Sequence, residues 1–369
     1  MKVLITGSNG FVGKNLRCFL SLKDDVEILC YDIDSTPEEL DRYTKECDFV
    51  YHLAGVNRPK DSKEFMEGNY GFTSILLNKL IEHNNKAPIM ISSSIQAKLD
   101  NEYGISKKAG EDLIFKYGKE NDVKVYVYRF PNLFGKWCRP NYNSVIATFC
   151  NNIAHNEKIV VNDENKELEL AYIDDVCEEI IKCLNDLSTK DGDFYVVPTT
   201  YKKTLGDIAN LIKSFKENDN GIMVPSTGDE FVKKLYATYI SYVPLNKMVV
   251  DLTEHRDNRG FFCELVRTKE CGQISVSTTN PNIIRGGHYH HTKMERFIVI
   301  KGEAEIEFEH ILNHEKIKFN VSGEKLQYVT IPVGYQHRIN NVGNQELVLI
   351  LWANELYDAN KPDTFVMDV

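Results

Sequence analysis

The chain has 369 residues, of which 42% are hydrophobic and 27% charged, with a formal net charge of −10 and a pI near 5.6. The length predicts two or three compact units, and the composition is that of a folded protein, not of a disordered or collagen-like chain. The acidic balance offers no basic face for a phosphate backbone, so we expect no nucleic-acid partner.

No apolar run approaches the roughly 18 to 20 residues that span a bilayer, and the opening MKVLITGSNG lacks the pattern of a secretory signal. Nine cysteines form no CxxC pair, and their odd number leaves at least one unpaired. We therefore expect a soluble cytoplasmic protein without membrane contact, in which the cysteines are small buried side chains.

The first part of the chain alternates apolar strands with helices of amphipathic spacing. Residues 2–6 are expected to form a strand, followed by a glycine turn and a helix over 11–22. Further elements are strands over 26–33, 47–55, 87–94 and 123–130, with helical segments such as 73–85 between them. This alternation predicts an α/β fold, a Rossmann-type doubly wound parallel sheet covered on both faces.

The character of the sequence changes between residues 220 and 246. A turn-rich stretch is followed by a helical segment over 231–243, which ends at Pro244. Short alternating strands with Gly, Asn and Pro turns then follow over 273–279, 296–311, 324–342 and 346–353. They predict an all-β jelly-roll barrel. We expect an α/β domain over residues 1–244 and a β domain over residues 245–369.

Gly7, Gly10 and Gly13 lie at the first strand–helix turn, where backbone amides and the positive helix end can approach a pyrophosphate. The GxxGxxG spacing differs from the general dinucleotide fingerprint and could be a structural turn, but its position favours dinucleotide binding. Asp32 and Asp34 follow the second strand. An acid there accepts from the adenosine ribose and favours NAD(H), although a turn aspartate is about as common.

Tyr103 and Lys107 are four residues apart and project from one face of a predicted helix. A phenol with a pKa of about 10 is a poor acid at neutral pH, and a neighbouring ammonium would lower that pKa. A YxxxK pattern alone is more often a surface pair. Here it follows the serine run 92–94 at the end of a strand, where open α/β sheets bind ligands and a hydroxyl can reach the reacting oxygen.

Together the glycine turn, residues 52–55 (HLAG), the serine run, YxxxK and residues 129–135 (RFPNLFG) resemble the extended short-chain dehydrogenase/reductase family. The resemblance covers about the first 240 residues. It implies that Tyr103 is the proton donor, that Lys107 binds the nicotinamide ribose and tunes Tyr103, and that Ser94 orients the carbonyl, with Ser93 as the rival. The cofactor would be held by Gly7, Gly10, Gly13, Asp32 and Lys107.

Sugar-nucleotide dehydratases of this family carry an Asp-Glu pair after the catalytic hydroxyl residue. Here Ile95 and Gln96 follow Ser94, so carbonyl reduction is expected instead of dehydration. In related enzymes the segment that corresponds to residues 129–143 binds the nucleotide diphosphate. The candidate ligands, each with a solvated surface residue as the alternative, are Arg129, Asn132, Lys136, Arg139, Asn141 and Asn143.

The C-terminal part carries a set of metal-binding residue types. His288 and His290 are two residues apart and so face one side of a strand. With Glu295 and His337 they make a three-histidine, one-carboxylate set suited to zinc or another divalent metal such as Fe, Mn or Ni. A lone HxH pair is often a satisfied or exposed pair, but these four spacings match the two motifs of the cupin family, which implies a metal-binding barrel.

A second resemblance competes for His288. Residues 257–262 and 284–289 resemble the dTDP-sugar 3,5-epimerase branch of cupins, where the histidine of the Arg-Gly-x-His motif removes a proton beside a sugar ketone. In that branch the position of His290 is usually Gln, and the histidine here favours a metal. One ring nitrogen of His288 cannot both bind metal and act as the free base, so its role stays open.

The whole chain, including residues 131–150 and 360–369, resembles the CapF family of bifunctional capsular-polysaccharide enzymes in UDP-N-acetyl-L-fucosamine synthesis. The resemblance implies C3 epimerisation of a UDP-2-acetamido-2,6-dideoxy-hexos-4-ulose in the cupin, then C4 reduction to a UDP-N-acetyl-6-deoxy-L-talosamine-type product. It also implies NADP(H), against which Asp32 argues, with NAD(H) possible. We further expect a homodimer.

Ketone chemistry sets the order of the two steps, because the C3 proton is acidic only while C4 is a ketone. Epimerisation is therefore expected first. Two alternatives remain: an NAD-retaining UDP-sugar 4-epimerase, and a nicotinamide-sensing scaffold with a sugar-binding cupin. Intact Tyr103 and Lys107 argue against the scaffold.

Overall fold

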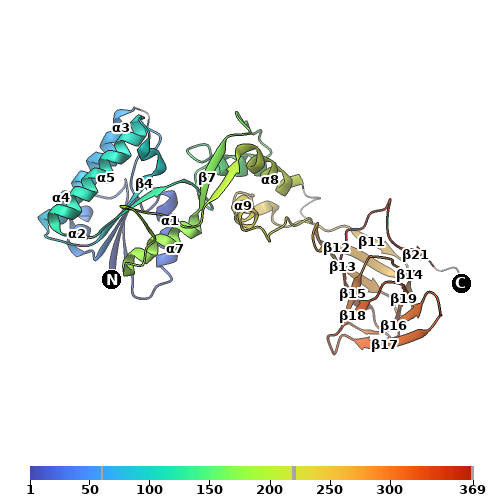
Figure 1. The fold of residues 1–369 in the computed structure, drawn as a ribbon. Coiled ribbons are helices and arrows are strands. Elements are labelled where there is room, and N and C mark those ends of the chain that lie inside the picture. Colours follow the sequence, from blue (N-terminus) through green and yellow to red (C-terminus); the bar gives the residue numbers. More distant parts are fainter. Residues whose placement is uncertain (60, 218–221, 367–369) are drawn as a thin grey trace. The chain divides into compact units, whose positions relative to one another are not determined.

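The computed structural model describes residues 1–59, 61–217 and 222–366, which form two compact units (Figure 1). Unit 1 comprises Met1–Lys213 and Lys234–Pro244, and unit 2 comprises Ser214–Lys233 and the chain from Leu245 onward. The division runs through two helices, α8 (Leu205–Glu217) and α9 (Glu230–Ile240). Among the described residues, no helix has both the length and the apolar character that a bilayer crossing requires.

A seven-stranded sheet with the order β2-β1-β3-β4-β5-β9-β8 forms the centre of unit 1. Its strands are β1 (Lys2–Thr6), β2 (Glu27–Tyr31), β3 (Phe49–His52), β4 (Ile89–Ser94), β5 (Val125–Phe130), β8 (Lys190–Asp191) and β9 (Phe194–Tyr195). The first five are parallel. The strand order reverses at β1, so the carboxyl ends of β1 and β3 form the switch point where such sheets bind ligands.

Helices cover both faces of this sheet (Figure 1). One face packs on α1 (Phe11–Leu20) and α7 (Ile173–Ile181). The other packs on α2 (Pro37–Glu46), α4 (Phe72–Glu82) and α5 (Glu102–Asn121). Residues such as Leu4 and Val50 are fully buried between the layers. Burial on both faces explains the continuous apolar strands, and the predicted doubly wound α/β sheet is confirmed.

Smaller elements complete unit 1. A three-stranded sheet has the order β10-β7-β6, made of β6 (Asn132–Phe134), β7 (Glu167–Tyr172) and β10 (Tyr201–Thr204). The remaining helices and turns are α3 (Lys63–Met66), η1 (Glu67–Gly71), η2 (Ile95–Lys98), α6 (Val145–Ala154) and η3 (Lys182–Asn185). Asn101 caps α5, because its Oδ1 accepts from the Gly104 amide at 2.8 Å. The cap fixes the start of α5, so that Tyr103 lies in its first turn.

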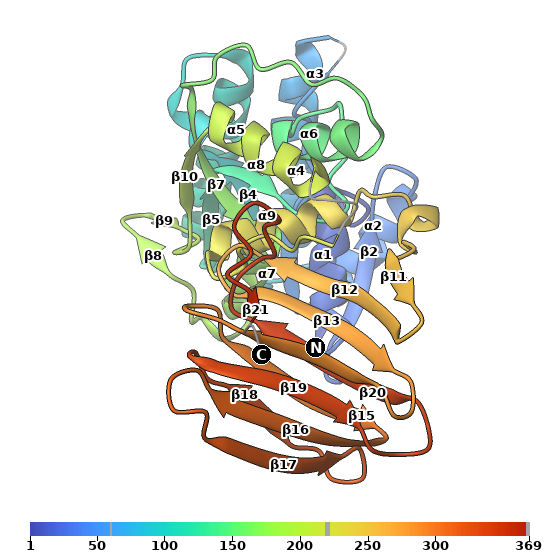
Figure 2. The ribbon, with the colours of Figure 1, turned by 90° about the vertical axis from the view of Figure 1, so that its right-hand side faces the viewer.

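Unit 2 is built from two antiparallel sheets, with the orders β11-β12-β13-β20-β15-β18 and β17-β16-β19-β14-β21 (Figure 2). A short turn, η5 (Leu245–Lys247), precedes them. The strands are β11 (Glu254–Asp257), β12 (Gly260–Thr268), β13 (Gly272–Thr279), β14 (Ile284–Tyr289), β15 (Glu295–Lys301), β16 (Glu303–His310), β17 (Lys316–Ser322), β18 (Tyr328–Ile331), β19 (Tyr335–Asn341), β20 (Leu347–Ala353) and β21 (Phe365–Val366).

The core of unit 2 contains Phe297, Ile306, Ile339 and Leu349, which come from both sheets. This confirms the predicted all-β fold.

The segment before α9 belongs to the same unit. The Val224 amide donates to the Arg267 carbonyl at 2.8 Å, and the Arg267 amide donates to the Ile222 carbonyl at 2.9 Å.

Candidate functional site

The glycine turn after β1 lies tightly against its neighbours. Gly7 has a φ of 70°, and a Cβ on it would lie 2.7 Å from the backbone nitrogen of Ala54. A Cβ on Gly13 would lie 2.3 Å from the Gly7 carbonyl oxygen. Gly10 caps α1 without a side-chain hydrogen bond. The first helical turn therefore has no side-chain cap, as an anion-binding helix end requires.

Asp32 borders this glycine turn. Its Oδ2 accepts from the Asn9 amide at 2.7 Å, and its Oδ1 accepts from the Ile33 amide at 2.8 Å. The Asp32 carboxylate therefore stabilises the turn, which sequence analysis gave as one of its two possible roles. It also lies where an adenosine ribose is expected to bind. Asp34 is exposed.

Tyr103, Lys107 and Ser94 lie together at the carboxyl end of β4. Ser94 hydrogen-bonds the Tyr103 side chain, and Lys107 Nζ is 5.9 Å from the centroid of the Tyr103 ring. Lys107 Nζ also donates to the Ser92 carbonyl at 3.1 Å. A Cβ on Gly55 would lie 2.9 Å from this Nζ, so the glycine of the HLAG segment leaves room for the lysine. The arrangement brings together the Tyr103 phenol, the Lys107 ammonium and the Ser94 hydroxyl.

Burial is the main influence on the pKa of Tyr103 and on that of Lys107. It raises the pKa of Tyr103, and the hydrogen bond with Ser94 partly offsets the rise. It lowers the pKa of Lys107 to about 8, against the opposing influence of Glu111. Burial therefore keeps the pKa of Tyr103 above its ordinary value, and the tuning of Tyr103 by Lys107 stays a prediction.

Ser93 and Arg129 are both bound to Glu111, a carboxylate with no exposed side-chain surface. The Ser93 hydroxyl donates to Glu111 Oε1 at 2.6 Å. Arg129 Nε and Nη2 donate to the two carboxylate oxygens at 2.8 and 2.6 Å, and the guanidinium lies 3.7 Å from the Phe194 ring centroid. Ser94 is thus the hydroxyl beside Tyr103. Arg129 is corrected from a diphosphate ligand to a structural residue, because Glu111 takes up its guanidinium.

One cavity of about 460 Å³ connects the glycine turn, the Tyr103 group and the segment after β5. Asn132, Arg139 and Asn143 line it, as do Trp137 and Tyr142, which were not among the predicted residues. This volume is in the range of ligand pockets in proteins. Of the other candidates, Lys136 is paired with Asp174, and Asn141 has a φ of 54° in the same loop.

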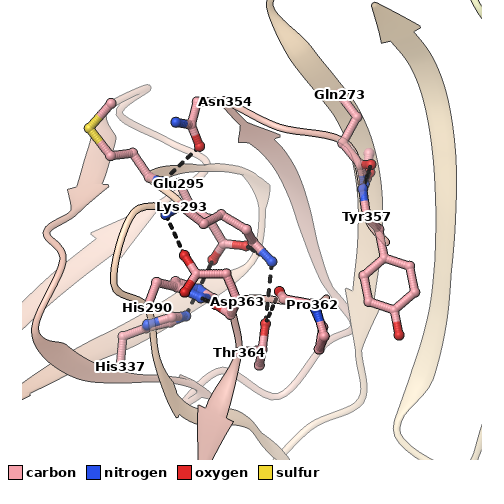
Figure 3. A network of polar contacts seen from close by, with 12 residues as sticks. Gln273, His290, Lys293, Glu295, His337, Asn354, Tyr357, Pro362, Asp363 and Thr364 are labelled. Atoms are coloured by element: carbon pink, nitrogen blue, oxygen red, sulfur yellow. Dashed lines mark hydrogen bonds and ion pairs between the residues drawn. The ribbon is translucent and has the colours of Figure 1, made fainter. Parts of the chain in front are cut away.

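The four predicted metal ligands converge in unit 2, and Figure 3 shows three of them, His290, Glu295 and His337. One ligand atom from each of His288, His290, Glu295 and His337 lies within 4.8 Å of all the others. Glu295 Oε2 is 3.4 Å from His290 Nε2 and 3.3 Å from His337 Nε2. Both histidines are 1% exposed, and these Nε2 atoms have no hydrogen-bond partner. Buried ring nitrogens without partners beside a carboxylate fit a divalent metal.

A β-bulge in β14 positions the first of these histidines. Gly286 and Gly287 have φ angles of 90° and 87°, and the register with β19 shifts between Gly286 and His288. The shift places His288 opposite His337. A Cβ on Gly286 would lie 2.6 Å from the His337 carbonyl oxygen. Glycine is needed here because the bulge requires a backbone that other residues rarely adopt.

The protonation states suit metal binding. Burial, followed by the charge of His337, lowers the pKa of His288 to about 4. Burial alone would raise the pKa of Glu295, but the imidazoles of His290 and His337 hold it well below its usual range. A neutral His288 imidazole and an ionised Glu295 carboxylate are forms that bind metal.

A second cavity, of about 450 Å³, borders this cluster. Its lining includes Glu295 and Lys293 together with Glu264, Gln273 and Ser275. Lys293 Nζ lies 3.7 Å from Glu295 Oε1. Sequence analysis did not single out Lys293, because no motif marks it. The cluster therefore has a ligand-sized cavity beside it, with both apolar and charged side chains in its lining.

The motif that resembles the epimerase branch forms the turn between β11 and β12. Arg259 forms an ion pair with Asp257, and Gly260 has a φ of 139° that the turn requires. Arg285 donates to the Thr278 carbonyl at 2.8 Å. These contacts hold Arg259 and Arg285 in place, while the role of His288 in the motif stays a prediction.

The chain resembles characterised proteins over its whole length. The NAD dependent epimerase/dehydratase family matches residues 3–197, and the polysaccharide biosynthesis C-terminal domain matches residues 255–365. A UDP-2-acetamido-2,6-beta-L-arabino-hexul-4-ose reductase from Pseudomonas aeruginosa is 39% identical over 369 residues, which cover 100% of this chain and 99% of the relative.

Solved structures agree with these matches. The capsular polysaccharide assembling protein CapF from Staphylococcus aureus has a TM-score of 0.93 and 46% identity, with 100% of both chains covered. A UDP-glucuronic acid 4-epimerase from Bacillus cereus, solved with NAD, has a TM-score of 0.53 and 18% identity over 59% of this chain and 85% of its own, and shows the fold alone. The chain therefore belongs to the NAD dependent epimerase/dehydratase family and, within it, to the CapF-type nucleotide-sugar enzymes that carry a polysaccharide biosynthesis C-terminal domain.

Proposed function

We propose that the protein is a bifunctional enzyme acting on a UDP-2-acetamido-2,6-dideoxy-hexos-4-ulose. It epimerises C3 in the cupin domain, residues 245–369, and then reduces C4 in the reductase domain, residues 1–244, giving a UDP-N-acetyl-6-deoxy-L-talosamine-type product. The observation that carries this proposal is that one chain holds two sites: the Tyr103 group beside a dinucleotide-type glycine turn, and the cluster of three histidines with Glu295. The name of the Pseudomonas aeruginosa relative supports the substrate class.

In the reductase domain, Ser94 hydrogen-bonds the C4 carbonyl oxygen and Tyr103 donates a proton to that oxygen. Lys107 binds the nicotinamide ribose. When bound, NAD(P)H supplies the hydride. Asn132, Arg139 and Asn143 hold the nucleotide diphosphate, since they line the same cavity as Tyr103.

In the cupin domain, His288, His290, Glu295 and His337 hold a divalent metal, with zinc as the first candidate. When bound, the metal supplies positive charge for the sugar oxygen that becomes anionic as the C3 proton leaves. The cavity bordered by Lys293 and Glu264 receives the sugar. Epimerisation comes first, because reduction of C4 removes the ketone that makes the C3 proton acidic.

The direct test incubates the protein with candidate UDP-4-ketosugars and identifies the products by mass spectrometry and NMR. We expect one reduced cofactor to be consumed for each sugar reduced, with inversion at C3. An NAD-retaining 4-epimerase would consume no stoichiometric cofactor, and a sensing scaffold would give no product. Either result would contradict the proposed function.

Cofactor choice is a separate prediction. We expect NADPH to be preferred, on the family resemblance, with NADH tolerated because Asp32 can accept from a free ribose hydroxyl. Arg17 also favours NADPH, because a guanidinium at this turn can pair with the 2′-phosphate of the adenosine ribose. Its Nη1 lies 2.9 Å from Asn9 Oδ1 at the same turn. The measurement compares kcat/KM for the two cofactors in the native protein and in Asp32→Asn, which should raise the preference for NADPH. A strong native preference for NADH would show that the carboxylate outweighs the arginine.

A pH profile follows from Lys107. Because its pKa is lowered to about 8, the ammonium is present below that pH and is lost above it. We therefore expect kcat/KM for ketosugar reduction to fall as the pH rises through about 8, by about tenfold per pH unit for a single proton. A profile that stays flat to about pH 10 would contradict the assignment of an essential charged Lys107 with this pKa.

The homodimer stays a prediction. Light scattering of the purified protein should give twice the chain mass of 42.4 kDa. A mass equal to one chain would contradict it.

A further inference from the structure

We propose that Asp363, in the C-terminal segment, is a positioning residue of the metal site, so that this segment is part of the site. The inference rests on the metal site proposed above and adds to it a residue remote in the sequence. Figure 3 shows Asp363 beside His290 and Lys293, with its contacts to both.

The first contact orients His290. The Asp363 carbonyl oxygen accepts from His290 Nδ1 at 2.6 Å. A carbonyl can only accept, so this ring nitrogen carries the proton and Nε2 is left with a lone pair. That Nε2 is the atom 3.4 Å from Glu295 Oε2, and it has no hydrogen-bond partner. Asp363 thus fixes the tautomer in which His290 can bind metal through Nε2.

The second set of contacts holds the loop that joins His290 to Glu295. The Asp363 carboxylate accepts from the amides of His291, Thr292 and Lys293 at 3.1, 2.8 and 2.8 Å. It also accepts from the Thr292 hydroxyl at 3.0 Å. Four donors converge on one carboxylate, and these hydrogen bonds keep the pKa of Asp363 well below its usual range even though burial opposes them. The Asp363 side chain therefore holds the conformation of the loop between the metal ligands His290 and Glu295.

The flanking residues hold Asp363 in place. It has a φ of 39°, a conformation that aspartate tolerates better than most residues, and it is followed by β21. In that strand Val366 pairs with His288, and Phe365 pairs with Tyr289. The terminal strand thus lies against the ligand-bearing strand β14.

The experiment compares Asp363→Ala with Asp358→Ala. Asp358 is a matched control in the same segment, because its carboxylate bonds the Asn360 amide two residues away. Zinc affinity of the full chain is measured by competition with a chelator. Asp363→Ala keeps the backbone carbonyl that bonds His290, but it removes the carboxylate that holds residues 291–293 and, through them, the position of that carbonyl. Loss of such a contact behind a metal ligand typically weakens binding by about 10- to 100-fold, and we expect that effect in Asp363→Ala and not in Asp358→Ala. Equal zinc affinity in Asp363→Ala and the native protein would overturn the inference.

A second measurement needs no metal and separates positioning from general destabilisation. Nitrogen-15 NMR of the metal-free protein reports which ring nitrogen of His290 is protonated. We expect protonated Nδ1 in the native protein and in Asp358→Ala. In Asp363→Ala we expect a mixture of tautomers, because the carboxylate no longer holds the Asp363 carbonyl against His290, while amide signals outside residues 291–293 and the segment around Asp363 stay native. An unchanged tautomer would count against the inference. Failure of the native protein to bind zinc would instead refute the proposed metal site.

Discussion

Replacing Tyr103 with phenylalanine is expected to slow ketosugar reduction on the order of 10²- to 10⁴-fold, while the protein still folds and binds nucleotide. The change removes only the hydroxyl that is proposed to protonate the C4 oxygen. The ring keeps its packing against Phe65, whose centroid is 5.6 Å away. The rate is measured from cofactor absorbance, and nucleotide affinity by titration calorimetry.

The control for this variant is Tyr70→Phe. Tyr70 is 40% exposed, so removal of its hydroxyl should leave the reduction rate unchanged. If Tyr103→Phe kept more than about a tenth of the native rate, Tyr103 would be excluded as the essential acid, since general acid–base catalysis usually contributes at least about 100-fold.

The features that sequence predicted well are those that local periodicity determines. The five parallel strands are continuous apolar runs because both faces of the sheet are buried. Tyr103 and Lys107 are one helical turn apart in α5, and Ser94 ends the strand before it, so spacing alone brings them together. In the same way, His288 and His290 are two residues apart at the end of β14, which closes at Tyr289.

The features that sequence missed depend on contacts between distant residues. Arg129 looks like a diphosphate ligand until Glu111, 18 residues earlier, is found buried beside it. Asp363 is 73 residues from His290, and no spacing rule connects them. The pKa of Tyr103 depends on how deeply the fold buries the phenol, which YxxxK spacing does not specify. Local patterns thus predicted which residues carry the chemistry, while the residues that hold them required the structure.

Replacing His290 with alanine is expected to remove metal and stop C3 epimerisation. His290 is 1% exposed and its Nε2 faces Glu295 at 3.4 Å, so the change deletes one of four converging ligands. Loss of a residue that hydrogen-bonds a metal ligand already weakens metal binding by about 10- to 100-fold. Loss of the ligand itself should therefore weaken metal binding by at least about 100-fold. The variant can also be less stable, because metal binding contributes folding energy. Metal content is measured by mass spectrometry.

Epimerase turnover has its own readout, deuterium incorporation at C3 from heavy water followed by NMR, which does not depend on cofactor absorbance. In His290→Ala we expect no exchange at C3, yet slow reduction of the unepimerised 4-ketosugar, because the Tyr103 group lies in a separate compact unit. His314→Ala is the matched control, since this histidine is 63% exposed and pairs with Glu309. If His290→Ala kept normal metal content and normal exchange at C3, both the metal-site assignment and its link to epimerisation would be wrong.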